Sequence, residues 1–124
     1  MNNSSESAND KSLNYSIHYD CEAEIISLSG KLHLIQREKA FHEILSWFDL
    51  VINKEPPRVL LDVSNLYYLN SLGISIVAKF VIRARDKKSI HVVVKASKQI
   101  TWQTKSLVNL KRIMPSLEFI FSDP

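Results

Sequence analysis

The sequence predicts an α/β domain, because segments typical of strands alternate with segments typical of amphipathic helices. One strand signal is an apolar run rich in branched residues, 58–64, which is followed by helical spacing of apolar residues from 71 onward. Another is the run 89–96, whose unbroken apolar centre is typical of a strand buried on both faces. The length of 124 residues suits a single domain with its own core. We expect a mixed β-sheet of about five strands flanked by about three helices.

The first half of the chain begins with strand signals. Over 13–19 apolar and polar residues alternate, as in a strand with one face in water. A second strand is predicted over 23–29 and is expected to end at Gly30. The residues before these strands, 1–12, are rich in Asn and Ser and predict a disordered polar tail. The single domain is therefore expected to span 13–124.

Helices are predicted where apolar residues recur three or four positions apart. The first helix is expected over 36–52, and two prolines end it before residue 58. Its apolar stripe consists of Phe41, Ile44, Leu45, Phe48 and Ile52. A later helix is predicted over 98–110, with Ser97 as its cap, and a last short strand over 117–121.

The junction between the run 58–64 and the next helix carries the most specific local signal. Asn70 and Ser71 have side-chain oxygens that can accept a backbone N–H at a helix start. A short polar-aromatic loop is expected just before them, at 65–69. Gly73 falls in the first turn of the helix, where glycine is costly, so we expect something to approach the backbone closely there.

Two segments of this junction, Val59-Leu-Leu-Asp-Val-Ser and Leu69-Asn-Ser-Leu-Gly-Ile, resemble the signature of STAS domains, in particular bacterial anti-sigma-factor antagonists. The resemblance implies a STAS-like fold, with the family's final helix missing here. It also implies a non-catalytic partner-switching regulator of transcription. Its partners would be a serine kinase or anti-sigma-type protein and a serine phosphatase, and Ser71 would be the phosphoacceptor. The family usually has Asp where this chain has Asn70, which leaves open a constitutive protein-interaction scaffold that is not phosphorylated.

The helix that begins at residue 70 also predicts a docking surface. Small and apolar side chains form a stripe beside Ser71, and an exposed stripe of this kind is typical of a protein interface. The predicted partner-binding residues are Asn70, Leu72, Gly73, Ser75, Ala78 and Ile82. The alternative is that another helix of the chain covers this stripe.

Charge is unevenly distributed along the chain. Residues 1–62 hold 6 Lys/Arg and 10 Asp/Glu, a net of −4, whereas residues 63–124 hold 10 Lys/Arg and 3 Asp/Glu, a net of +7. A basic half favours an acidic or phosphate-bearing partner, or else it is simply a solvated surface. A nucleic-acid partner is disfavoured, because the basic residues are spread over several predicted elements without a base-reading motif.

The remaining sequence signals concern location and chemistry. No apolar run has the length of a membrane span, and the lone Cys21 fits a reducing compartment, so we expect a cytoplasmic protein without membrane association. The four histidines lack metal-ligand spacing, and two glycines cannot build a phosphate loop. Asp62 could accept a phosphoryl group, but no acidic pair accompanies it to hold Mg²⁺. The alternative for Asp62 is a hydrogen bond to the following loop or to the turn at residues 70–71. We expect neither an enzyme nor a metal or cofactor site.

Overall fold

The computed structural model describes residues 5–10, 14–35 and 38–122 of the chain. Within them, six strands form one sheet in the order β1-β2-β3-β4-β5-β6. β1, β2 and β3 pair antiparallel, and β3, β4, β5 and β6 pair parallel. The strands are β1 (Ser5–Asp10), β2 (Tyr15–Asp20), β3 (Ile25–Leu32), β4 (Arg58–Leu69), β5 (His91–Ser97) and β6 (Glu118–Ser122).

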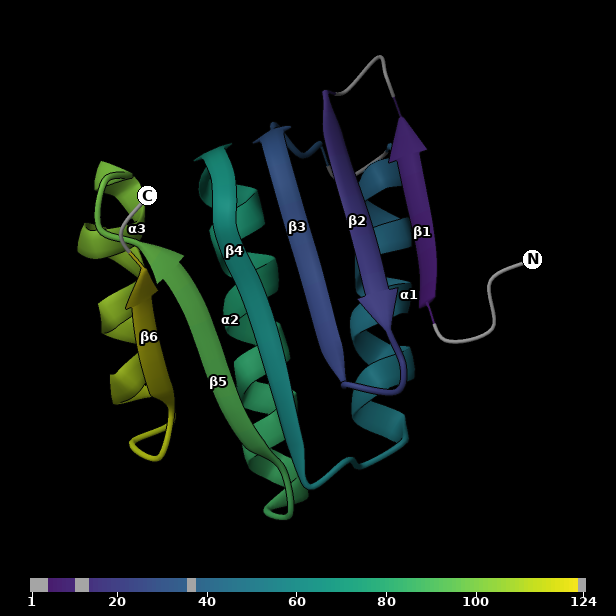
Figure 1. Cartoon of the computed structure of the whole chain (residues 1–124), viewed down its shortest axis with the longest axis vertical. Coiled ribbons are helices and arrows are strands. Elements are labelled where there is room, and N and C mark those ends of the chain that lie inside the picture. The colour runs from purple at the N-terminus through teal and green to yellow at the C-terminus, as the bar shows by residue number, and fades with distance from the viewer. Residues whose placement is uncertain (1–4, 11–13, 36–37, 123–124) are drawn as a thin grey trace.

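The helices lie on one face of this sheet (Figure 1). They are α1 (Lys39–Asn53), α2 (Ser71–Lys87), α3 (Thr101–Ser106) and the 3₁₀ helix η2 (Leu107–Arg112). The predicted α/β fold class with a mixed sheet is thereby confirmed. Among the described residues no helix is long and apolar enough to cross a membrane.

The amino-terminal residues differ from the expectation. A disordered tail was predicted over residues 1–12, but residues 5–10 form β1, which pairs with β2 from Ser5 opposite Asp20 to Asp10 opposite Tyr15. Backbone pairing at a sheet edge does not require apolar side chains, so composition gave no sign of this strand. The rest of the predicted tail, 1–4 and 11–12, lies outside the described residues.

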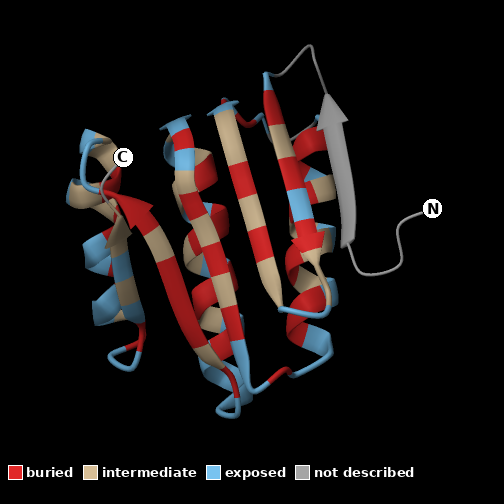
Figure 2. Cartoon of the chain, viewed as in Figure 1, coloured by how far each residue is buried: buried red, intermediate tan, exposed pale blue. Residues whose placement is uncertain are grey.

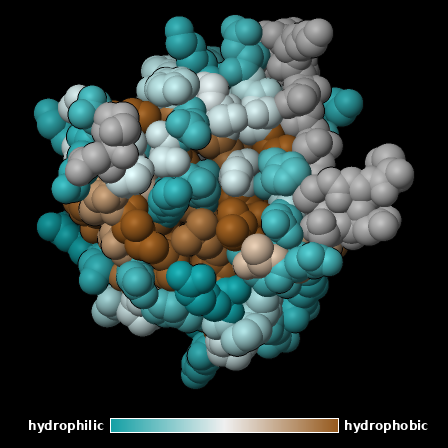
Figure 3. Space-filling model, in the orientation of Figure 1, coloured by the Kyte–Doolittle hydropathy of each residue, from teal (hydrophilic) through white to brown (hydrophobic). Residues whose placement is uncertain are grey.

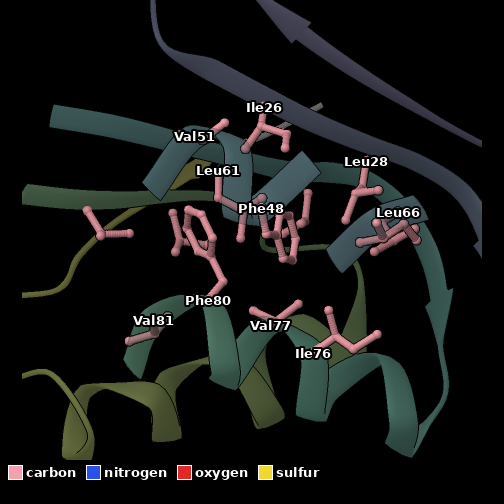
Figure 4. Close-up of a cluster of buried hydrophobic side chains, with 14 of the residues drawn as sticks. Ile26, Leu28, Phe48, Val51, Leu61, Leu66, Ile76, Val77, Phe80 and Val81 are labelled. Atoms are coloured by element: carbon pink, nitrogen blue, oxygen red, sulfur yellow. The ribbon is translucent and has the colours of Figure 1, made fainter. Parts of the chain in front are cut away.

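The core lies between the sheet and the two longest helices (Figure 4). Phe48 of α1 and Phe80 of α2 meet at its centre, with ring centroids 4.7 Å apart. Burial alternates along β4, where every second residue from Val59 to Val63 faces this core (Figure 2). The apolar stripe predicted for the first helix faces the core as well: Phe41, Ile44, Phe48 and Ile52 are buried, and Leu45 is partly buried.

Three predicted boundaries are wrong. β3 continues through Gly30 to Leu32, because Gly30 pairs with both neighbouring strands, opposite Tyr15 of β2 and Leu66 of β4. Its φ of 92° suits glycine, and a Cβ there would lie 2.3 Å from the carbonyl oxygen of Asn14. The predicted loop 65–69 is the end of β4. The predicted helix 98–110 is shorter and is split into α3 and η2, and Ser97 is the last residue of β5 rather than its cap.

The sheet face opposite the helices carries an apolar band, which Figure 3 shows crossing the middle of that face. Ile25, Leu60 and Val93 are neighbours in register on β3, β4 and β5. They alternate with residues that face the helices, so they belong to the opposite face. Burial along β5 is continuous from Val92 to Val94, which agrees with the predicted strand buried on both faces.

Candidate functional site at the start of α2

Ser71 is the first residue of α2 and is exposed. β4 ends at Leu69, so a single residue, Asn70, connects the strand to the helix. Asn70 has extended backbone angles, its side-chain oxygen accepts from the N–H of Gly73 at 3.2 Å, and its carbonyl accepts from Ile74. The predicted helix start is confirmed. Of the two residues expected to cap it, Asn70 is the cap, whereas Ser71 is the first helical residue.

The side chain of Asn70 has a second set of partners, on the segment that follows β3. Its Oδ1 accepts from the N–H of Leu34 at 3.1 Å, and its Nδ2 donates to the carbonyl oxygen of Leu34 at 2.8 Å. The amide therefore pairs with the Leu34 backbone as a neighbouring peptide group would. A carboxylate has no donor and could not make the second of these bonds. The difference between this chain and the Asp of the family pattern thus has a visible structural consequence.

Gly73 is buried in the first turn of α2. A Cβ built on it would lie 2.1 Å from Cδ1 and 2.7 Å from Cγ of Leu69. The close approach predicted from the glycine is confirmed, and the approaching group is the side chain of Leu69. Gly73 therefore lets the end of β4 pack against the start of α2, and it presents no side chain to a partner.

The docking stripe predicted on α2 is only partly open. Ser75 is exposed, whereas Leu72, Ala78 and Ile82 are half-buried. Leu72 and Ala78 pack against the hydrophobic core. Core packing therefore uses part of the apolar surface that the sequence assigned to a partner, and the binding role of these residues stays a prediction.

Apolar side chains that the sequence analysis missed are exposed beside the start of α2. Tyr67 and Tyr68 of β4 are 59% and 46% exposed, and Ile35, just after β3, is 46% exposed. The parallel pairing of Leu32 with Leu69 brings the ends of these two strands together. Two consecutive tyrosines in a strand were an available signal, because alternation cannot bury both on one face. The register between β3 and β4 shifts here, passing from the pair Gly30–Leu66 to the pair Lys31–Tyr68 and leaving Tyr67 without a counterpart.

The end of β4 is held from its other side by two residues of α3. The ladder between β4 and β5 extends only to Asp62 opposite Lys95. Beyond it, the fully buried Gln103 bridges the two strands: its Oε1 accepts from Ser97 N–H at 2.7 Å, and its Nε2 donates to the carbonyls of Val63 and Leu66 at 2.6 and 2.9 Å. Trp102 Nε1 also donates to the Leu66 carbonyl, at 3.0 Å. No local sequence signal reveals the contacts with β4, because they join residues 36 to 40 positions apart.

Asp62 accepts hydrogen bonds from the N–H and the hydroxyl of Ser64, at 3.0 and 2.6 Å, so its partner is within β4. Neither of the two partners expected for Asp62, the predicted loop at 65–69 and the turn at residues 70–71, makes these bonds. Across the described part of the chain, no group of three or more His, Cys, Asp or Glu side chains could hold a metal ion.

The electrostatics of the site suit an anion. The first turn of α2 contains no acidic residue, and the last turn contains Arg85 and Lys87. The free N–H groups and the macrodipole of a helix favour negative charge at its N-terminus, typically by 0.3–1 kcal/mol at an exposed site. A phosphoryl group on Ser71 would lie at this end of the dipole.

Comparisons with known proteins give a fold but no sequence family. No family model and no curated protein sequence matches the chain. SiaC of Pseudomonas aeruginosa aligns with a TM-score of 0.72 over 98% of this chain and 99% of its own, at 15% identity. A chain in the structure of the diguanylate cyclase SiaD in complex with its activator SiaC, from the same organism, aligns at 0.68 over 89% and 92%, at 16% identity.

An anti-sigma factor antagonist from Mycobacterium paratuberculosis aligns with a TM-score of 0.55 over 76% of this chain and 74% of its own, at 23% identity. At these identities the likeness concerns the fold. The STAS-like fold expected from the residues around Ser71 is confirmed.

Proposed function

We propose that the protein is a non-catalytic, cytoplasmic partner-switching regulator that binds a switch kinase or anti-sigma-type protein, and that phosphorylation of Ser71 controls this binding. The observation that carries the proposal is the exposure of Ser71 at the first position of α2, next to exposed apolar side chains at the ends of β3 and β4. A serine phosphatase would reverse the modification.

The switch follows from the charge that phosphorylation adds. A phosphoserine carries about −1.5 to −2 charges at pH 7. The start of α2 accommodates such an anion, so the fold changes little. A partner that packs on Tyr67, Tyr68 and Ile35 would have to desolvate that charge or pair with it, which changes its affinity. Binding and release then need no rearrangement of the sheet.

A second candidate concerns the target of the switch. SiaC, the activator in the complex with a diguanylate cyclase, aligns over nearly the whole of this chain, whereas the anti-sigma factor antagonist aligns over about three quarters. This difference favours a diguanylate cyclase as the regulated partner over a sigma-factor pathway. Adding the protein to such a cyclase, with and without phosphate on Ser71, and measuring cyclic di-GMP made from GTP distinguishes the two outputs.

Two further hypotheses from the sequence keep their own tests. A constitutive scaffold would bind its partner equally well with or without kinase and ATP. A nucleic-acid binder would bind short DNA or RNA with an affinity that falls steeply as salt rises.

The main experiment uses a candidate partner serine kinase. Incubation with that kinase and ATP, followed by mass spectrometry, should place phosphate on Ser71. Ser75, exposed one turn later on α2, is the matched control, so Ser75→Ala should leave phosphorylation intact and Ser71→Ala should abolish it. Phosphate absent from Ser71, or present to the same extent in Ser71→Ala, would contradict the proposal.

A further inference from the structure

Asn70 connects two parts of the surface that are far apart in the sequence. It caps α2 next to Ser71, and it bonds to both backbone groups of Leu34, 36 positions earlier. Leu34 is 3% exposed, and the next residue, Ile35, is 46% exposed. The amide therefore fixes the exposed Ile35 relative to the exposed Ser71.

The three hydrogen bonds require an amide on a short side chain. Oδ1 accepts from two N–H groups, those of Leu34 and Gly73, while Nδ2 donates to the Leu34 carbonyl. Asp would keep the acceptor but would place a carboxylate oxygen about where Nδ2 now stands, against a carbonyl oxygen, which is repulsive. Ser would keep a neutral cap, but its side chain is too short to reach both groups of Leu34.

A second contact joins the same two segments. The rings of His33 and Tyr68 are stacked with centroids 6.3 Å apart and planes inclined by 12°. His33 precedes Leu34, and Tyr68 is two residues before Asn70. The exit of β3 and the junction between β4 and α2 are thus joined both on the surface, by the rings, and beneath it, by the amide.

We propose that Asn70 is a positioning residue that makes Ser71 and Ile35 parts of one rigid surface, so that phosphorylation of Ser71 is transmitted to the segment after β3 through the Asn70 side chain. This inference deepens the proposed function and rests on it for its biological meaning. It predicts that the partner contacts both segments. It also predicts that the switch requires an amide at position 70, so that Asn70 is not functionally equivalent to the Asp of the family pattern.

The test uses the full chain and needs no natural kinase. Phosphoserine is installed at position 71 by semisynthesis in the wild-type chain and in Asn70→Ser, which keeps a neutral cap. In the wild type, phosphorylation should shift the backbone amide resonances of Leu34 and Ile35. In Asn70→Ser these shifts should largely disappear, while the shift of Gly73 persists. Equal shifts at Leu34 and Ile35 in both proteins would mean that the charge acts through space, and would overturn the proposal.

Hydrogen exchange of the unmodified chain provides a second readout. The Leu34 amide should exchange about five- to tenfold faster in Asn70→Ser than in the wild type, as expected for the loss of one hydrogen bond. Exchange at Ile17, at the centre of β2, reports global stability and measures how much of the change at Leu34 is a general loss of stability. Unchanged exchange at Leu34 would also overturn the proposal. Because phosphoserine is introduced chemically, these results do not depend on whether a kinase modifies Ser71 in the cell, which the mass-spectrometry experiment decides separately.

Discussion

Gln103 provides the sharpest test of how the end of β4 is held. Its side chain is fully buried and bonds to Ser97 N–H and to the carbonyls of Val63 and Leu66. Replacement by Leu keeps a similar volume but removes the amide. The Leu66 carbonyl keeps a donor in Trp102 Nε1, whereas the N–H of Ser97 loses the acceptor it has here.

The expected cost can be estimated from these groups. A buried donor or acceptor left without a partner costs about 1–3 kcal/mol. The N–H of Ser97 and the carbonyl of Val63 are affected most, and the added apolar burial of Leu returns roughly 1–2 kcal/mol. We therefore expect Gln103→Leu to lower the free energy of unfolding by about 1–4 kcal/mol, measured by urea denaturation followed by circular dichroism.

The matched control is Gln99→Leu, an exposed glutamine in the turn before α3, which should change stability by no more than about 0.5 kcal/mol. A third variant, Gln103→Glu, tests the direction of the bonds. Its acid can donate to the carbonyls only when it is protonated, so burial and these acceptors should raise its folded-state pKa. Its stability relative to the wild type should therefore be greatest at low pH and should be lost as pH rises through that pKa. Equal losses in Gln103→Leu and Gln99→Leu would refute the reasoning.

Three further predictions concern other parts of the molecule. Gly73→Val should lower the free energy of unfolding by about 1–3 kcal/mol, because its side chain would overlap Leu69; chemical denaturation measures this, and a loss near zero would contradict the packing described. Burial, followed by a bond to a glutamate, raises the pKa of Tyr19 above 10.0, and a bond from Lys54 to Tyr19 raises the pKa of Lys54. Because both folded-state pKa values are raised, the stability that Tyr19 and Lys54 contribute is complete below about pH 10 and is lost as pH rises further. The loss should be smaller in Tyr19→Phe, measured by urea denaturation at pH 8 and 11. Asp49→Asn should change stability by less than about 1 kcal/mol, because both members of its ion pair between α1 and α2 are more than 40% exposed; thermal unfolding checks this, and a larger loss would be inconsistent with solvent screening.

Local signals predicted the helix start and its surroundings well. The cap at Asn70 and the close approach at Gly73 depend on residues within one turn of each other, so the sequence contains the information directly. The apolar stripe of α1 was predictable for the same reason, since helical periodicity is local.

Features that depend on distant partners were not predicted. The end of β4 was expected to be a loop, because its polar and aromatic residues do not show that Gln103 and Trp102 supply hydrogen bonds after β5 separates from it. β1 was missed because backbone pairing with β2 leaves no apolar pattern. The sequence predicted an exposed apolar surface near Ser71 along α2, whereas the large apolar side chains exposed there are Tyr67 and Tyr68 at the end of β4.

The most direct test of the central claim compares the affinity of the partner protein for the unmodified chain and for the chain phosphorylated on Ser71, by isothermal titration calorimetry. A switch at the start of α2 predicts affinities that differ by about fivefold or more, in the range of coupling free energies typical of regulated binding. Equal affinities of the partner for the two forms would contradict the account.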